Sequence, residues 1–343
     1  MRRLRVLVAL HKHLVPPESI EGVPEEEIYK WKLEYDVLAA LEKLGHKVQL
    51  APVEDDLAPI RDGLAAHQPH IVFNLLTHFH DAGVYHSAIV SWLELLKQPY
   101  TGCNPRGLLV ANDKALSKKV MNYHRIRAPR FLNVAMGRRI ERLPSGMEFP
   151  LFVKSASEHA SQGIAEASLV RDLDQLNERS EFIHRTIGTA ALCEQYIEGR
   201  ELTIGVLGND RLETSPVWEV FMENLREGAP NIYTSRVKWD TSYQRKIGLR
   251  TGPAELSEKK AAEIDRLARR LYKALGLSGY ARIDLRLDEE ERPWVLEANP
   301  NPDLCYGEDF AESFEKKPRG YSYLEIVQRI INLGLRYDAP WRG

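Results

Sequence analysis

Two alternating runs near the C-terminus constrain most strongly what this chain can fold into. The first is Arg282-Ile-Asp-Leu-Arg-Leu287, and the second is Pro293-Trp-Val-Leu-Glu-Ala-Asn-Pro300, with the acidic segment Asp288–Arg292 between them. In a strand, side chains two residues apart lie on the same face. The two runs and their short connection therefore predict an antiparallel hairpin whose polar side chains share one face.

The polar face of this hairpin carries two carboxylates and an amide, Asp284, Glu297 and Asn299, beside the guanidinium of Arg282. Hard oxygen ligands of this kind suit Mg²⁺, which proteins usually hold with one or two carboxylates and the phosphates of a nucleotide. We predict a Mg²⁺ site here, with Mn²⁺ as the alternative ion. The competing interpretation is an ordinary hairpin with a solvated polar face.

Composition limits the classes of protein that this chain can belong to. Its 343 residues allow one large domain or two to three small ones. Charged residues make up 28% and the formal net charge is −2, so no overall basic field attracts nucleic acid or a membrane. The cysteines Cys103, Cys193 and Cys305 are odd in number and far apart, which predicts free thiols in a reducing compartment.

The N-terminus resembles a signal peptide at first sight. Its apolar run Val6–Leu10 is too short, and His11-Lys-His13 follows where a small-residue cleavage site would stand, so we interpret it as a buried strand. No run approaches the 18 apolar residues of a membrane span. We therefore expect a soluble, cytoplasmic protein, with a homodimer as one form of assembly.

The order of elements predicts three segments. Residues 1–103 alternate strands (5–10, 47–51, 70–75) with helices (27–44, 57–66, 85–96), a pattern typical of a doubly wound parallel sheet. A central segment, 104–190, and a C-terminal segment, 191–343, follow. The fold class is α/β, with α+β character in the C-terminal part. A polar loop is predicted at Asn231–Arg245, and helices at 257–275 and 323–335.

Lys154 ends an apolar strand and precedes the small-residue loop Ser155–Ile164. Small residues let backbone amides approach an anion closely, so this loop is a candidate phosphate cradle. A flexible loop with a solvated lysine is the alternative. Further on, Glu194 and Glu201 flank a glycine-containing turn between strands, where a backbone edge could meet adenine and a glutamate the ribose. A hairpin with solvated acids is the alternative there.

Taken together, these segments resemble the ATP-grasp superfamily and, within it, D-alanine–D-alanine ligase and its relatives. The resemblance rests on motifs in the family order: Asn112-Asp-Lys-Ala-Leu-Ser-Lys118, Phe152-Val-Lys-Ser155, Ser161-Gln-Gly163, Glu194-Gln-Tyr-Ile197 with Gly199-Arg-Glu201, Ala281-Arg-Ile-Asp284, and Leu296-Glu-Ala-Asn-Pro300. It implies an ATP-grasp fold behind an N-terminal α/β domain. The implied activity is an ATP-dependent carboxylate–amine ligase.

The resemblance also implies roles for individual residues. ATP would be contacted by Lys114, Lys154, Ser161, Glu194, Gln195, Tyr196, Ile197, Glu201 and Lys238. Mg²⁺ would be held by Asp284, Glu297 and Asn299, and Arg282 would stabilise the oxyanion of a tetrahedral intermediate, with Lys238 and Ser161 also catalytic. A substrate carboxylate would take the γ-phosphoryl group to give an acylphosphate, which an amine then attacks.

The N-terminal half departs from the family's substrate motifs. His11 and His13 follow the first strand, and His78 and His80 follow the third. Ligands of doubly wound sheets bind beyond the carboxyl ends of the strands, so these histidines are candidate substrate ligands. A second metal site and solvated loop histidines are the alternatives. Glu308 is a candidate partner for the incoming ammonium group.

Three further functions compete with the leading one. The chain could be a genuine D-alanine–D-alanine ligase, an ATP-grasp kinase that leaves phosphate on a small molecule, or a nucleotide-binding module without activity. The last is disfavoured because Arg282, Lys238 and both metal carboxylates are present.

Overall fold

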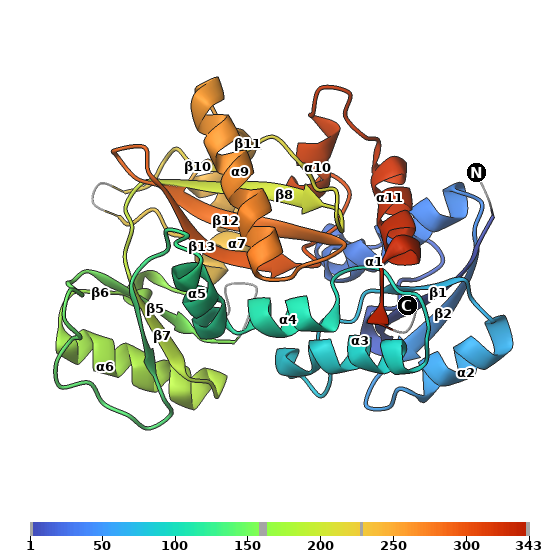
Figure 1. Cartoon of the computed structure of the whole chain (residues 1–343), viewed down its shortest axis with the longest axis horizontal. Helices are drawn as coiled ribbons and strands as arrows, with labels where there is room; N and C mark the ends of the chain where they lie inside the picture. The colour runs from blue at the N-terminus through green and yellow to red at the C-terminus, as the bar shows by residue number, and fades with distance from the viewer. Residues whose placement is uncertain (1–2, 158–162, 227–228, 341–343) are drawn as a thin grey trace.

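The computed structural model describes residues 3–157, 163–226 and 229–340. Within these residues the chain forms an N-terminal parallel sheet, a central antiparallel sheet and a larger C-terminal antiparallel sheet. Figure 1 shows the central sheet at the lower left, the C-terminal sheet above it and the N-terminal sheet on the right. The predicted α/β class with a parallel N-terminal sheet is therefore confirmed.

The N-terminal sheet has the strand order β2-β1-β3, and its strands run parallel. β1 is an almost continuous apolar run because helices cover both faces of a parallel sheet. The elements of this part are β1 (Arg5–His11), η1 (Lys12–Leu14), α1 (Glu25–Lys43), β2 (Lys47–Val53), α2 (Ala58–His67), β3 (Ile71–Asn74), η2 (Gly83–Tyr85) and α3 (His86–Leu95). The predicted strands and helices are confirmed to within a few residues.

The central part is built on a sheet in the order β4-β7-β5-β6. Residues 191–195, which we placed in the C-terminal segment, form β7 and pair with β4 and β5. Asn104 and Asp113 cap α4 and α5 by accepting backbone hydrogen bonds. The elements are α4 (Pro105–Asn112), α5 (Lys114–Tyr123), β4 (Phe131–Val134), β5 (Leu151–Ser155), η3 (Glu166–Ser168), β6 (Leu169–Val170), α6 (Leu173–Phe182), η4 (Ile183–Ile187) and β7 (Ala191–Gln195).

The C-terminal sheet has the order β11-β10-β8-β12-β13, with β9 paired to β8. β12 and β13 pair antiparallel, which confirms the predicted hairpin. The elements are β8 (Arg200–Leu207), β9 (Glu213–Thr214), β10 (Trp218–Met222), α7 (Ser235–Trp239), α8 (Thr241–Lys246), β11 (Leu249–Pro253), α9 (Glu258–Ala274), β12 (Tyr280–Leu287), β13 (Pro293–Pro300), α10 (Asp309–Glu315) and α11 (Tyr323–Arg336).

The buried cores show which parts of the fold pack together. Buried residues of the N-terminal sheet share a cluster with α10 and α11, and α11 packs against α1 and β3. The central sheet has a core of its own, which includes Val153 and Leu176. The central part therefore packs around its own core and meets the rest of the protein mainly at the cavity described below. Among the described residues, no helix is long and apolar enough to cross a membrane.

Candidate active site

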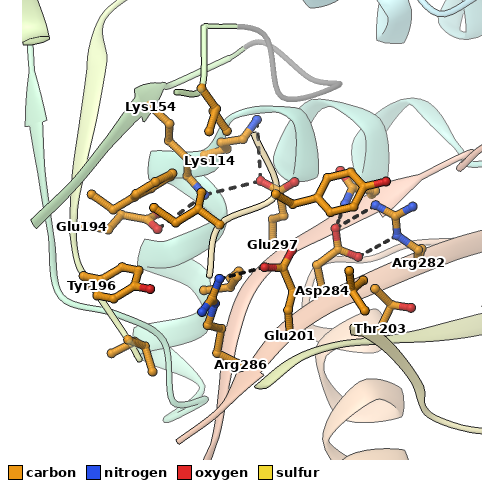
Figure 2. Close-up of a pocket in the computed structure, with 18 of the residues that line it drawn as sticks. Lys114, Lys154, Glu194, Tyr196, Glu201, Thr203, Arg282, Asp284, Arg286 and Glu297 are labelled. Atoms are coloured by element: carbon orange, nitrogen blue, oxygen red, sulfur yellow. Dashed lines mark hydrogen bonds and ion pairs between the residues drawn. The ribbon is translucent and has the colours of Figure 1, made fainter. Parts of the chain in front are cut away.

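A cavity of about 220 Å³ lies between the central sheet and the C-terminal sheet. Every predicted nucleotide or metal residue that the structure describes lines it, namely Lys114, Lys154, Glu194, Gln195, Tyr196, Ile197, Glu201, Lys238, Asp284, Glu297 and Asn299, together with Arg282. Ser161 lies outside the described residues. Figure 2 shows Lys114 and Lys154 entering from the central side and the hairpin residues Arg282, Asp284 and Glu297 from the other. The sequence motifs thus meet at a single site.

The hairpin carries its polar residues at paired positions. Asp284 lies opposite Glu297, and Arg282 lies opposite Asn299. The guanidinium of Arg282 donates two hydrogen bonds to Asp284, from Nε at 2.7 Å and from Nη2 at 2.8 Å. Asn299 donates a third to Asp284 at 2.8 Å. Burial outweighs the attraction of Arg282 and raises the pKa of Asp284. The hydrogen bonds from Arg282 and Asn299 therefore fix the position of the Asp284 carboxylate, but they do not fully offset the cost of burying its charge.

Lysines from the central part converge on Glu297. Lys154 on β5 and Lys114 at the start of α5 place their Nζ atoms 3.5 Å and 3.8 Å from its Oε2 (Figure 2). The carboxylate of Glu194 on β7 lies between Lys154, at 3.4 Å, and Lys118, at 3.0 Å. Burial opposes the charge of Lys154, but Glu194 and Glu297 outweigh it and raise its pKa. Lys154 therefore stays a cation in a buried position.

Lys118 is the site residue whose position was least expected. It is almost fully buried, and it bridges Glu194 and the carbonyl oxygen of Leu296, 3.1 Å from Nζ. Burial lowers its pKa. Since Leu296 lies on β13 and Glu194 on β7, Lys118 ties the central sheet to the β12–β13 hairpin. Sequence analysis had quoted it within a motif but gave it no role.

Arg286 is a second residue that sequence analysis missed. Its Nη2 atom lies 2.7 Å from Oε2 of Glu201, the predicted ribose ligand (Figure 2). Burial raises the pKa of Glu201 in spite of this arginine. Arg286 follows Asp284 by two residues on β12. The same alternation that identified Arg282 and Asp284 places it on their face.

Apolar side chains form the remaining wall of the cavity near β7. They come from β5, β10, β13 and the segments beside them: Phe152, Ile164, Ile197, Val220, Ile232 and Leu296. Such residues give a flat aromatic base a dry surface, while the nearby backbone after β7 offers hydrogen-bonding groups.

The predicted polar loop at 231–245 is wrong in its local structure. The chain forms two short helices there, α7 and α8, whose first turns are capped by Thr234 and Asp240. Ile232, Tyr233 and Lys238 from this stretch line the cavity, and the backbone N–H of Ser235 donates to Ile164 O at 3.0 Å. Burial and the nearby Arg282 lower the pKa of Lys238.

We expect residues 231–245 to close over a bound nucleotide. Amide hydrogen exchange there should slow by at least about tenfold when a saturating non-hydrolysable ATP analogue is added, because the ligand stabilises the closed form. The exposed hairpin connection at residues 288–292 serves as the internal control. Equal exchange in 231–245 with and without the analogue would contradict a lid.

The N-terminal histidines gather next to one another but outside this cavity. β1 and β3 are neighbours, as predicted, and the rings of His11 and His78 stack at 3.8 Å, with His13 at 5.6 Å from His11. His80 instead places Nδ1 3.3 Å from Asp55 Oδ1. Burial, together with His78, lowers the pKa of His11 to about 4, so its ring is neutral at pH 7. Among the described residues lining the cavity, none is a histidine.

Carboxylates collect on the side of the cavity that faces α1. Asp309 lines the cavity, and Glu308 precedes it at the start of α10. Burial, and then Asp303, raises the pKa of Glu308. Glu34 on α1 is 3% exposed, and burial, reinforced by Asp303, raises its pKa to about 7. A positively charged group bound beside Glu308 would lower its pKa.

Glu34 predicts a pH dependence of stability. Its folded pKa of about 7 lies above the unfolded 4.5, so ionisation destabilises the fold as pH rises from 4.5 to 7. Glu34→Gln should therefore raise the free energy of unfolding by roughly 3 kcal/mol at pH 8 and change it little at pH 4. Denaturant unfolding at both pH values measures this, with the exposed Glu42→Gln on the same helix as control. An equal effect at both pH values would refute the assignment.

Comparison with solved structures identifies the fold. D-alanine–D-alanine ligase from Bacillus anthracis matches with a TM-score of 0.73 at 21% identity, covering 97% of this chain and 98% of that chain. Its structure complexed with ATP matches with a TM-score of 0.72, also at 21% identity and the same coverage. The chain therefore has the ATP-grasp fold that the motifs predicted.

Comparison with known sequences extends this result. The family described as D-ala D-ala ligase C-terminus matches residues 116–332. The D-alanine–D-alanine ligase of Bordetella petrii is 32% identical over 70% of this chain and 69% of its own length, and that of Bordetella avium is 31% identical over 75% and 76%. An uncharacterized protein of Sinorhizobium fredii, y4sG, is 29% identical over 88% and 86%.

The fold and the site together define an ATP-grasp carboxylate–amine ligase. Within that class, the chain belongs to the D-alanine–D-alanine ligase family.

Proposed function

We propose that this ligase joins the carboxylate of an amino acid or small peptide-like molecule to an amine through an acylphosphate, releasing ADP and phosphate. One observation carries the proposal: Asp284, Glu297, Arg282 and the buried Lys154 surround a single cavity between two sheets. A carboxylate is a poor electrophile, so it must be activated before an amine can displace its oxygen. Phosphoryl transfer needs cations and metal ligands around the phosphates, and the lysines, Arg282 and carboxylates of this cavity are groups of that kind.

The residues present fit a divalent metal. Asp284 and Glu297 are cross-strand partners, and Asn299 lies on the same strand as Glu297, two residues away. Among the described residues, no three His, Cys, Asp or Glu side chains form a complete cage. A site of two carboxylates and an amide suits Mg²⁺, which takes its remaining ligands from phosphates and water. When bound, Mg²⁺ would neutralise charge on the transferred phosphoryl group.

For the nucleotide, we propose that adenine enters the apolar wall beside β7 and meets the backbone of residues 195–197. Glu201, oriented by Arg286, would accept hydrogen bonds from the ribose. Lys114, Lys154 and Lys238 would contact phosphates. Lys238 and Arg282 face the same cavity, and burial and Arg282 lower the pKa of Lys238, so an anion between them would be stabilised.

Glu194 acts indirectly in this proposal. Its carboxylate is engaged by Lys118 and Lys154, so it is a positioning residue that holds Lys154 toward the phosphates. Arg282 would stabilise the oxyanion that forms when the amine attacks, because its guanidinium is fixed by two hydrogen bonds to Asp284. Closing residues 231–245 would keep water from hydrolysing the acylphosphate.

The amine would enter from the side of Glu308 and Asp309. Their half-buried, mutually repelling carboxylates favour an ammonium group. His11, His13, His78 and His80 would shape the far end of the substrate site. His11 would do so as a neutral hydrogen-bonding ring, because burial and His78 lower its pKa to about 4. D-alanine, which the named relatives use, is the first candidate substrate for either position.

A phosphate-release screen of amino-acid pairs with ATP and Mg²⁺ tests this function. A ligase releases phosphate only when both a carboxylate and an amine partner are present, and the product contains both. D-alanine alone as a sufficient substrate would identify a genuine D-alanine–D-alanine ligase. ADP formation without free phosphate would instead show a kinase.

A further inference from the structure

An open groove of about 690 Å³ lies outside the active site, where the end of α5, the segment 125–130, α9 and β13 meet. Its lining within the described part of the chain includes five arginines and a tryptophan: Arg125, Arg127, Arg130, Arg266, Arg270 and Trp294. The arginines come from two separate stretches of sequence, so the fold gathers them. Nothing in the proposed ligase reaction uses this groove.

The groove has almost no compensating negative charge. Glu263 is the carboxylate found among its described lining residues, and Lys260 already holds it at 2.7 Å. No ion pair joins a carboxylate of the described residues to the five guanidiniums; Asp265, which pairs with Arg269, interacts with Arg266 only at longer range. Arg130 donates to the carbonyl of Gly146 at 2.7 Å, and Arg270 donates to that of His124. Arginine cannot lose its proton in a protein, so the positive charge remains at every physiological pH.

The chemistry of the lining specifies the kind of anion. Guanidinium groups bind phosphate oxygens in pairs of parallel hydrogen bonds, and several of them together favour an anion with several charged oxygens. The guanidinium of Arg127 lies over the indole of Trp294, with its carbon 5.5 Å from the ring centre. We propose that this groove is a second anion site, which binds an oligophosphate, either free or as the tail of a nucleotide.

The groove is separate from the cavity but adjoins it. Gln195, at the end of β7, lines both. Its backbone N–H donates to the carbonyl of Arg130 at 2.8 Å, and Val295 N–H donates to that of Arg127 at 2.9 Å. The arginine segment is thus bonded to β7 and to β13, the strands that carry Glu194 and Glu297. A measurement of the second site must therefore be made with the active-site cavity already filled.

Inorganic tripolyphosphate is the probe. The full-length protein is first saturated with a non-hydrolysable ATP analogue and Mg²⁺, and tripolyphosphate is then titrated by calorimetry. We expect Arg127→Gln/Arg266→Gln to bind it at least about tenfold more weakly than the unaltered protein, with a shallower dependence on salt. Arg171→Gln/Arg185→Gln removes two exposed arginines of the central part and should stay within about twofold.

Further arms separate the outcomes. Circular dichroism checks whether Arg127→Gln disturbs folding. If it does, Arg125→Gln/Arg266→Gln takes its place, because it keeps the stacked Arg127 and should also weaken tripolyphosphate binding. A second equivalent of the ATP analogue, lost in the groove variants, would identify a nucleotide as the source of the phosphates. Citrate should bind more weakly than tripolyphosphate. Equal tripolyphosphate affinity in all variants would overturn the proposal. So would the binding of neither tripolyphosphate nor a second equivalent of the ATP analogue once the cavity is filled.

Discussion

Asp284→Asn and Glu297→Gln are each expected to lower kcat by two to three orders of magnitude at limiting Mg²⁺ while keeping the shape of the side chain. Each change removes an anionic ligand from the predicted metal site, and a metal's stabilisation of transferred charge contributes several kcal/mol, with each 1.36 kcal/mol equal to a factor of ten. Glu297→Gln also removes the carboxylate that faces Lys114 and Lys154. The measurement is ADP formation as a function of Mg²⁺ concentration.

The matched control is Glu290→Gln, which removes a carboxylate from the exposed connection of the same hairpin. It should leave kcat and the Mg²⁺ requirement unchanged. Asp284→Asn leaves the half-buried Arg282 without its charged partner, which can destabilise the fold. The side chain of Glu297 is more exposed than that of Asp284, so Glu297→Gln is the variant to measure if Asp284→Asn unfolds. Near-normal turnover of a folded Glu297→Gln at limiting Mg²⁺ would remove the metal assignment.

The hairpin face was predictable because strand alternation is a local rule. Asp284, Glu297 and Asn299 follow from a period of two and a short connection, and the observed register pairs Asp284 with Glu297. The same rule would have identified Arg286, which sequence analysis passed over because it looked only for metal and oxyanion ligands. Its contact with Glu201 needed the pairing of β8 with β12, which no local pattern specifies.

The ion pairs among the lysines could not be predicted from the sequence for a different reason. Lys118, Lys154 and Glu194 come from a helix and two strands, and the ion pairs depend on how α5 packs beside the sheet. The assignment of residues 191–195 to the C-terminal segment was affected in the same way, since β7 pairs with β4 and β5. Sequence order gives no preference between the two neighbouring sheets.

The helices α7 and α8 were missed although their signals are local. Thr234 and Asp240 each stand at an N-cap and accept a backbone hydrogen bond from the first turn. These residues favour helix starts because their side-chain oxygens satisfy otherwise unpaired N–H groups. The polar composition of 231–245 was interpreted as a loop, and the two caps were not weighed. A lid built from short capped helices can still close as a unit.

Arg282→Lys should lower kcat by about 100-fold to 1000-fold with little change in the KM of the organic substrates. A fixed oxyanion donor acts in the transition state, and removing one typically has an effect of that size. Lysine keeps the charge but loses the planar fork that donates twice to Asp284. Steady-state kinetics with each substrate varied in turn separates kcat from KM.

Arg282 touches a proposed metal ligand, so the experiment must separate a direct role from one exerted through Asp284. If Arg282→Lys acted only by displacing Asp284, raising Mg²⁺ would restore kcat, whereas loss of oxyanion stabilisation persists at saturating Mg²⁺. Glu308→Ala provides the contrasting case, because a ground-state contact with the ammonium group should raise the amine's KM and leave kcat nearly unchanged. A full recovery of Arg282→Lys by Mg²⁺ would leave Arg282 as a positioning residue for Asp284.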